Sequence, residues 1–235
     1  MVGTIVNTAA ICVGTLLGQT VFRRITRDWH RSALQSVGLG VVFIGASTAL
    51  DAFRHWAIQL VLALVVGNLV GEALRIEDRL QALERRGPGA GSGDDEREGG
   101  LAKGFLAATL LFAVGPMAIL GGIQDGLGPQ PTILFTKSAL DGLSAIVLSA
   151  TLGIGVIFAA LPVLAIQGGA ALLAAQLAPV MTPDIVAAIS GVGGTLITAI
   201  GLNMLGATRV RVAALLPAIV LAPLGVWLTH ALGWG

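Results

Sequence analysis

The sequence predicts an all-α fold: a polytopic membrane helix bundle of about eight transmembrane helices, with an inverted-topology repeat of three helices flanking a central two-helix hairpin. Three observations predict it. Of the 235 residues, 55% are hydrophobic and only 11% are charged, against roughly 25% charged residues in soluble domains. Apolar runs long enough to cross a bilayer recur along the chain. Many of the 33 glycines lie inside these runs, which is typical of closely packed membrane helices.

A bilayer core of about 30 Å requires around 20 apolar residues of helix. The runs that meet this requirement are residues 4–21, 34–50, 56–74, 105–122, 133–152, 155–177, 185–205 and 210–232. No basic residue precedes the first run, whereas a cleavable signal peptide begins with a basic segment. We therefore expect the first run to remain in the mature protein.

The basic residues orient these spans, because loops on the cytoplasmic side are enriched in Lys and Arg. In an alternating eight-span topology, 12 of the 14 basic residues fall on one side. They are Arg23, Arg24, Arg27, Arg31, Arg75, Arg79, Arg85, Arg86, Arg97, Lys103, Arg209 and Arg211. Arg54 falls on the opposite side and Lys137 within a span, so both termini are predicted to be extracytoplasmic.

Aligning the chain with itself at a shift of 154 residues superposes the first three spans on the last three without gaps. An odd number of spans separates the starts of the two units, so they cross the membrane in opposite directions. Such inverted repeats recur in secondary transporters, which favours transport over the alternative that duplication produced only a stable bundle. The predicted segments are a first repeat (1–75), a charged cytoplasmic linker (76–103), a central polar helical hairpin (104–153) and an inverted second repeat (154–235).

The central hairpin contains the most unusual residues, Asp125, Lys137 and Asp141. A Lys or Asp at a helix centre costs about 2.5–3.5 kcal/mol on insertion, and each large aliphatic residue returns only about 0.3–0.6 kcal/mol. The span that contains Lys137 and Asp141 therefore depends on neighbouring helices or a water-filled cavity. Their spacing of four residues places both on one helix face, where pairing lowers the cost. A purely structural ion pair and an ion path are both open.

Intramembrane ionisable residues are by default candidates for ion or substrate sites. We hypothesise that Asp125 and Asp141 line an ion-coupled or proton-coupled path, although Asp125 could equally be a cap or an exit at the end of its span. Pro116 removes a backbone donor in mid-span and predicts a helix break there. Amide and hydroxyl groups in the apolar runs complete the candidate substrate or ion path, which comprises Asp125, Asp141, Lys137, Gln124, Ser138, Asn7 and Asn203.

Several functions are not expected. The formal charge of +1 gives no reason to expect nucleic acid as a partner. No spacing of His and Cys that could hold a metal occurs, nor does a phosphate-binding glycine loop, so no cofactor, metal or catalytic residue is expected. The motifs of intramembrane aspartyl proteases and CDP-alcohol phosphotransferases are also absent, and we do not expect an enzyme. The expected partners are the lipid bilayer and an unknown small solute or ion, and a homo-oligomer is left open.

Several motifs resemble one family in order along the whole chain. They are Gly3-Thr4-Ile5-Val6-Asn7, Leu111-Phe112 through Gln124-Asp125-Gly126-Leu127, Lys137-Ser138 with Leu140-Asp141-Gly142, Thr151-Leu152-Gly153-Ile154-Gly155-Val156, and Gly201-Leu202-Asn203. They are similar to the YqgA-like family of bacterial inner-membrane proteins, in which Ala usually stands at the position of Pro116. The resemblance implies a multi-pass protein of the bacterial cytoplasmic (inner) membrane and supplies no substrate. We expect secondary transport or channel-like movement of a small solute or ion, with a non-transporting membrane scaffold or sensor as the alternative.

Overall fold

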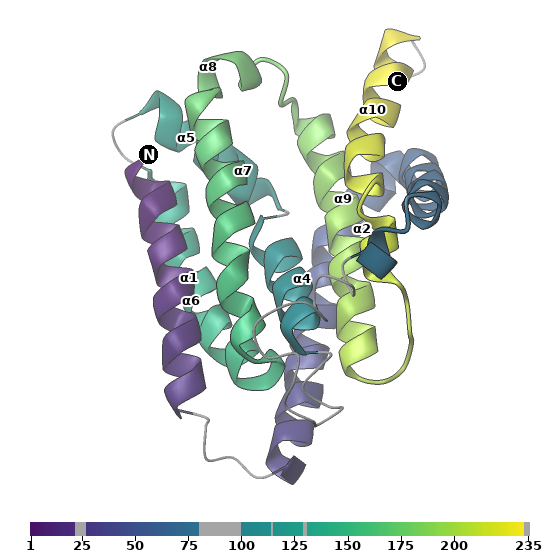
Figure 1. The fold of residues 1–235 in the computed structure, drawn as a ribbon. Coiled ribbons are helices and arrows are strands. Elements are labelled where there is room, and N and C mark those ends of the chain that lie inside the picture. The colour runs from purple at the N-terminus through teal and green to yellow at the C-terminus, as the bar shows by residue number, and fades with distance from the viewer. Residues whose placement is uncertain (22–26, 80–99, 114, 129–130, 233–235) are drawn as a thin grey trace. The chain divides into compact units, whose positions relative to one another are not determined.

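The structure is a computed structural model that describes residues 1–21, 27–79, 100–113, 115–128 and 131–232. Within these ranges the chain forms helices and no strand (Figure 1). The helices are α1 (Val2–Val21), α2 (Arg27–Ala73), α4 (Gly100–Ala113), α5 (Pro116–Leu127), α6 (Thr132–Leu152), η1 (Ile154–Ala159), α7 (Ala160–Leu172), α8 (Ala174–Leu177), α9 (Pro183–Met204), η2 (Val212–Leu215) and α10 (Ala218–Ala231). The predicted all-α fold is confirmed.

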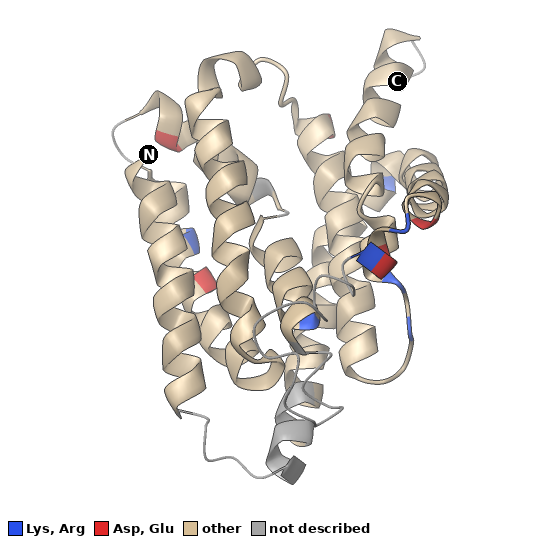
Figure 2. Cartoon of the chain, viewed as in Figure 1, with Lys and Arg blue, Asp and Glu red and all other residues tan. Residues whose placement is uncertain are grey.

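The predicted membrane spans correspond to these helices. Six helices among the described residues are long and apolar enough to cross a membrane, and the bent pair α4–α5 makes a seventh. Charged residues are sparse along them (Figure 2). The prediction of about eight transmembrane helices is roughly consistent with this count, because one of the six contains two predicted spans.

That helix is α2, whose apolar part runs over 39 residues from Gln35 to Ala73. At about 1.5 Å per residue it is roughly twice as long as the bilayer core is thick. We predicted separate spans at 34–50 and 56–74, and α2 consists of two helical parts that correspond to them. It bends at Trp56, which has non-helical dihedral angles (φ −123°, ψ 27°).

The chain divides into two compact units, and unit 1 comprises Met1–Val37 and Gln81–Ala178. Here α1 packs most extensively on α6. Gly3 lies against Leu134, Gly14 against Ala145 and Gly18 against Ser149, so the two helices run parallel. Figure 1 shows α7 beside them and running in the opposite direction to α1. These directions agree with the alternating topology that the sequence predicts.

Unit 2 comprises Gly38–Leu80 and Pro179–Gly235. Its helices pack through glycines in two antiparallel pairs. In the first pair Gly38 of α2 lies against Met204 of α9, and Gly45 lies against Gly194. In the second pair Gly67, beyond the bend of α2, lies against Ala218 of α10. The glycines allow the backbones to approach closely, as in other membrane helix pairs.

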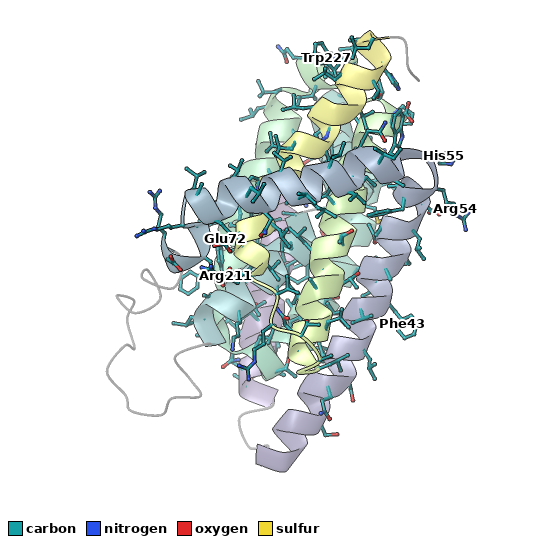
Figure 3. All side chains as sticks on the ribbon, turned by 90° about the vertical axis from the view of Figure 1, so that its right-hand side faces the viewer. Phe43, Arg54, His55, Glu72, Arg211 and Trp227 are labelled. Carbon is teal, nitrogen blue, oxygen red and sulfur yellow. The ribbon has the colours of Figure 1, made fainter. Side chains whose placement is uncertain are left out.

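The two ends of the second arm of α2 carry different polar contacts within unit 2. Near the bend, the Trp56 indole donates to Asp184 Oδ1 at 3.3 Å. At the far end, the Arg211 guanidinium pairs with Glu72 at 2.6 Å and with Asp78 at 2.7 Å. Figure 3 shows Glu72 and Arg211 together, and Arg54 at the bend. Basic segments that we predicted to share one side of the membrane thus meet at one end of this arm.

Each unit combines helices from both predicted repeats. Unit 1 contains α1 and the start of α2 from the first repeat, and η1, α7 and α8 from the second; unit 2 contains the rest of α2 with α9, η2 and α10. The antiparallel pairs α2–α9 and α2–α10 are the arrangement that an inverted repeat requires. The repeat itself stays a prediction, and most of the predicted linker, residues 80–99, lies outside the described residues.

Candidate functional site

Lys137 and Asp141 form an ion pair inside unit 1. Both lie on α6, one helical turn apart, and Lys137 Nζ is 2.8 Å from Asp141 Oδ1. Each side chain is only 8% exposed. Pairing of two buried charges is the condition under which such groups are tolerated in a low-dielectric interior.

Two amide side chains from other helices extend this pair. Asn7 of α1 donates through Nδ2 to Asp141 Oδ2 at 3.0 Å and to Gln167 Oε1 at 3.2 Å. Gln167 lies on α7, and both amide residues are completely buried. Asn7, Lys137, Asp141 and Gln167, which we call the polar cluster, therefore join three helices through one chain of hydrogen bonds.

The polar cluster has unused hydrogen-bonding capacity. Asn7 Oδ1 and Gln167 Nε2 are buried and have no hydrogen-bond partner among the described residues. Leaving a buried polar atom unpaired costs about 1–3 kcal/mol, and such atoms in native structures point to a missing water, ion or ligand. The cluster thus offers one acceptor and one amino donor beside an ion pair.

Glycines bring α1 close enough to α6 for Asn7 to reach Asp141. A Cβ on Gly14 would collide with the backbone oxygen of Gly142, and one on Gly18 with the Ser149 hydroxyl. Only the absence of side chains at these positions allows the two backbones to pack this closely. The spacing Gly14-x-x-x-Gly18 places both glycines on one face of α1.

The predicted span 105–122 is interrupted within unit 1. Helix α4 ends at Ala113, α5 begins at Pro116 with Gly115 as its N-cap, and their axes differ by 59°. The predicted break at Pro116 is confirmed. Proline is tolerated at the first helical position because its missing N–H would be unpaired there in any case.

Both parts of this interrupted span contact α6. Gly104 of α4 lies against Leu152, and Gly121 of α5 lies against Leu134. The next residue of α5, Gly122, lies against the backbone of Gln167 on α7, so α5 packs directly on a residue of the polar cluster.

Asp125 caps a helix. Its carboxylate accepts hydrogen bonds from the backbone N–H of Gly3 at 3.1 Å and from that of Thr4 at 2.9 Å. The Thr4 hydroxyl donates a third bond at 2.8 Å, and the Met1 amine is 3.0 Å from Oδ1. These are the N–H groups that a helix amino terminus leaves unpaired. Asp125 of α5 thus caps α1, and it has no contact with Asp141 among its hydrogen bonds.

Three further candidate residues also bond to backbone groups. Gln124 Oε1 accepts from the N–H of Ile133 at 3.1 Å, near the start of α6. The Ser138 hydroxyl donates to the Leu134 oxygen of its own helix at 2.6 Å. Asn203 lies in unit 2, where its amide bonds Thr208 and both backbone groups of Val210. Their hydrogen bonds are explained without a substrate or ion path, so a path role for these three residues stays a prediction.

Gln167 is the functional candidate that sequence reasoning missed. It lies in the predicted span 155–177, and the argument that selected Asn7, an amide in an apolar run, applies to it equally. No group of three or more His, Cys, Asp or Glu side chains within the described residues could hold a metal ion.

Together, the fold and the buried polar cluster define an α-helical, multi-pass membrane protein. The chain belongs to the family described as "Protein of unknown function (DUF554)", which matches residues 2–227. It is similar to "Uncharacterized membrane protein YdfK" of Bacillus subtilis (strain 168), with 30% identity over 235 residues and 99% of each chain. It is also similar to "Uncharacterized protein YqgA" of Escherichia coli (strain K12), with 29% identity over 229 residues and 94% of each chain. The predicted YqgA-like family is thereby confirmed, and no solved structure matches the chain significantly.

Proposed function

We propose that this protein is a secondary transporter or channel-like protein for a small solute or ion, and that the polar cluster is its binding site. One observation carries the proposal: Asn7 Oδ1 and Gln167 Nε2 are fully buried and unpaired beside the Lys137–Asp141 ion pair. A purely structural ion pair would not need two amides whose remaining polar atoms lack partners. The cluster therefore has the groups to hold a small polar ligand.

The break between α4 and α5 supports the same proposal. Transporters commonly place their sites at interrupted helices, whose free backbone groups and terminal charge contact the ligand. Irregular backbone at membrane depth is tolerated only where protein or a water-filled cavity satisfies it. Beyond the interruption, α5 contacts the polar cluster, because Gly122 packs against the backbone of Gln167.

Movement of the ligand requires that the polar cluster open to either side in turn. Its residues come from α1, α6 and α7, so a small shift of one of these helices changes the site. The proposal includes a place in the bacterial cytoplasmic membrane with both termini outside, and no enzymatic activity. In the alternative, a scaffold or sensor, the polar cluster would remain closed.

Accessibility of the polar cluster to water tests the proposal. In a Cys12→Ala background, Ser138→Cys places a thiol one residue from Lys137 at a buried position. We expect it to react with a membrane-impermeant thiol reagent in membrane vesicles, and ligand to slow the reaction. Leu143→Cys, on the same helix but 64% exposed on the apolar surface, is the matched unreactive control.

Lys103→Cys, at an exposed position, confirms that the reagent reaches the protein. If Ser138→Cys reacts from neither side of the membrane while Lys103→Cys is labelled, the cluster is sealed. The transport proposal is then wrong and the scaffold alternative is favoured.

A further inference from the structure

The polar cluster also constrains what it can bind, through its charge. With Lys137 protonated and Asp141 ionised, the cluster is neutral, and its residues are between 0% and 7% exposed. Any net charge in so closed a place costs several kcal/mol. A proton alone or an anion alone would each create such a charge, whereas the two together leave the cluster neutral.

The amides allow the polar cluster to accept a proton on Asp141 without losing hydrogen bonds. At present Asn7 donates to the Asp141 carboxylate and to Gln167. If both amides turn by 180°, Asn7 Oδ1 accepts one bond from protonated Asp141 and another from Gln167 Nε2. The two atoms that are now unpaired are those that make these bonds.

Protonation of Asp141 leaves Lys137 without its counter-charge. The Lys137 ammonium has three N–H donors, of which the bond to Asp141 uses one. A small anion that accepts from this ammonium restores neutrality. When the Asn7 amide turns by 180°, its Nδ2 takes the place of Oδ1 and becomes a second donor for the anion.

A cation fits the polar cluster less well. Hard cations prefer six or more oxygen ligands, and the cluster offers the Asp141 carboxylate and two amide oxygens beside an ammonium and an amino donor. No cluster of acidic, His or Cys side chains that could hold a metal lies elsewhere in the described ranges.

Other titratable groups lie on the helices packed against α6. They are Asp125 on α5, the Met1 amine and Cys12 on α1, and Lys103 on α4. Asp125 and the Met1 amine bond each other and the start of α1, and Lys103 is exposed. None of these groups hydrogen-bonds or pairs with Lys137 or Asp141.

We infer that the polar cluster binds one proton, on Asp141, together with one small monovalent anion, on Lys137. The site then performs electroneutral proton-anion cotransport. Because the cluster is closed on all sides, the anion is only a few atoms in size. This inference rests on the proposed function and names the ligand class and the coupling of the same site.

Calorimetric titration of the purified full-length protein tests the coupling. The probes are sodium chloride, sodium nitrate and sodium formate, with sodium gluconate, too large for the closed cluster, keeping sodium and ionic strength constant. Titration in two buffers of different ionisation enthalpy gives the number of protons taken up per anion. We expect about one proton, and an affinity that increases about tenfold for each unit of decreasing pH.

Variants separate the two bound species. Asp141→Asn imitates the protonated carboxyl group, so it should bind the anion without proton uptake and without pH dependence. The double variant Lys137→Gln/Asp141→Asn, which leaves no unpaired charge, should lose anion binding. Lys103→Gln is the matched control and should behave like the wild type.

The inference is wrong if none of the three anions binds, if an anion binds to the wild type without proton uptake, or if anion binding survives in the double variant. It is also wrong if replacing choline with sodium in the buffer releases protons from the protein. The last result would indicate cation-proton exchange. A reactive Ser138→Cys combined with any of them would leave the transport proposal standing and reject only the coupling. A sealed Ser138→Cys would reject the transport proposal itself.

Discussion

The Lys137–Asp141 pair predicts a large coupling between two substitutions. Lys137→Gln or Asp141→Asn alone leaves one charge in a site where each side chain is 8% exposed. Breaking a buried pair in this way costs about 3–5 kcal/mol of unfolding free energy. Removing both charges leaves none unpaired, so we expect the double variant to cost on the order of 1 kcal/mol. The coupling energy, which is the sum of the two single costs minus the cost of the double variant, is then about 5–9 kcal/mol.

Reversible unfolding in mixed micelles, followed by tryptophan fluorescence, measures this coupling as a double-mutant cycle. The matched control is the Arg211–Glu72 pair, whose nitrogen-oxygen distance is 2.6 Å but whose side chains are 44% and 40% exposed. Exposed pairs contribute about 0–1 kcal/mol, so the cycle Arg211→Gln/Glu72→Gln should give less than about 1 kcal/mol. Equal coupling in the two cycles would refute the argument that burial makes the Lys137–Asp141 pair interdependent.

The remaining predictions concern helix packing at two glycines, the cap of α1 and the loop that Asn203 holds. Gly122→Ala places a Cβ 2.9 Å from an α7 backbone oxygen and should destabilise the protein by about 1–3 kcal/mol. Gly40→Ala has open space around it and should stabilise the protein by up to about 1 kcal/mol. Thermal unfolding of the two variants measures this difference. Asp125→Ala removes the cap of α1, at a cost of about 1–2 kcal/mol of capping energy. Amide hydrogen exchange at Thr4 should therefore become about fivefold to thirtyfold faster. Unchanged exchange would contradict the capping role. Asn203→Ala removes three hydrogen bonds from its loop and should lower stability by about 1–3 kcal/mol without changing anion affinity; a loss of affinity would instead place Asn203 on the path.

The candidate site shows how far sequence reasoning reaches. Spacing along one helix predicts that Lys137 and Asp141 share a face, and the cost of burial predicts that they pair; the 2.8 Å contact agrees. The sequence leaves open whether Asp125 lines a path or only lies at the end of its span, and it could not identify the partners of Asp125 or Asp141. Their different contacts depend on which helix packs beside them: the start of α1 meets Asp125, and its second turn meets Asp141.

Gln167 shows the same limit. An amide in an apolar run predicts a need for a partner, but only the packing of α1 against α6 and α7 identifies that partner as Asn7. In α2, by contrast, local hydropathy predicted two spans, and the kink at Trp56 separates the two parts of the helix near the polar residues around Arg54.

The amino-acid sequence by itself determined the all-helical membrane class, the approximate spans, the break at Pro116 and the unusual charges of the central hairpin. These properties follow from composition and from local costs: transfer of side chains into lipid and the missing N–H of proline. Only the tertiary structure decided which polar groups meet, because contacts between α1, α6 and α7 join residues up to 160 positions apart. Local sequence preferences do not distinguish among the possible contacts between these helices. The contact that forms is the one in which Gly14 and Gly18 allow α1 to approach α6 closely.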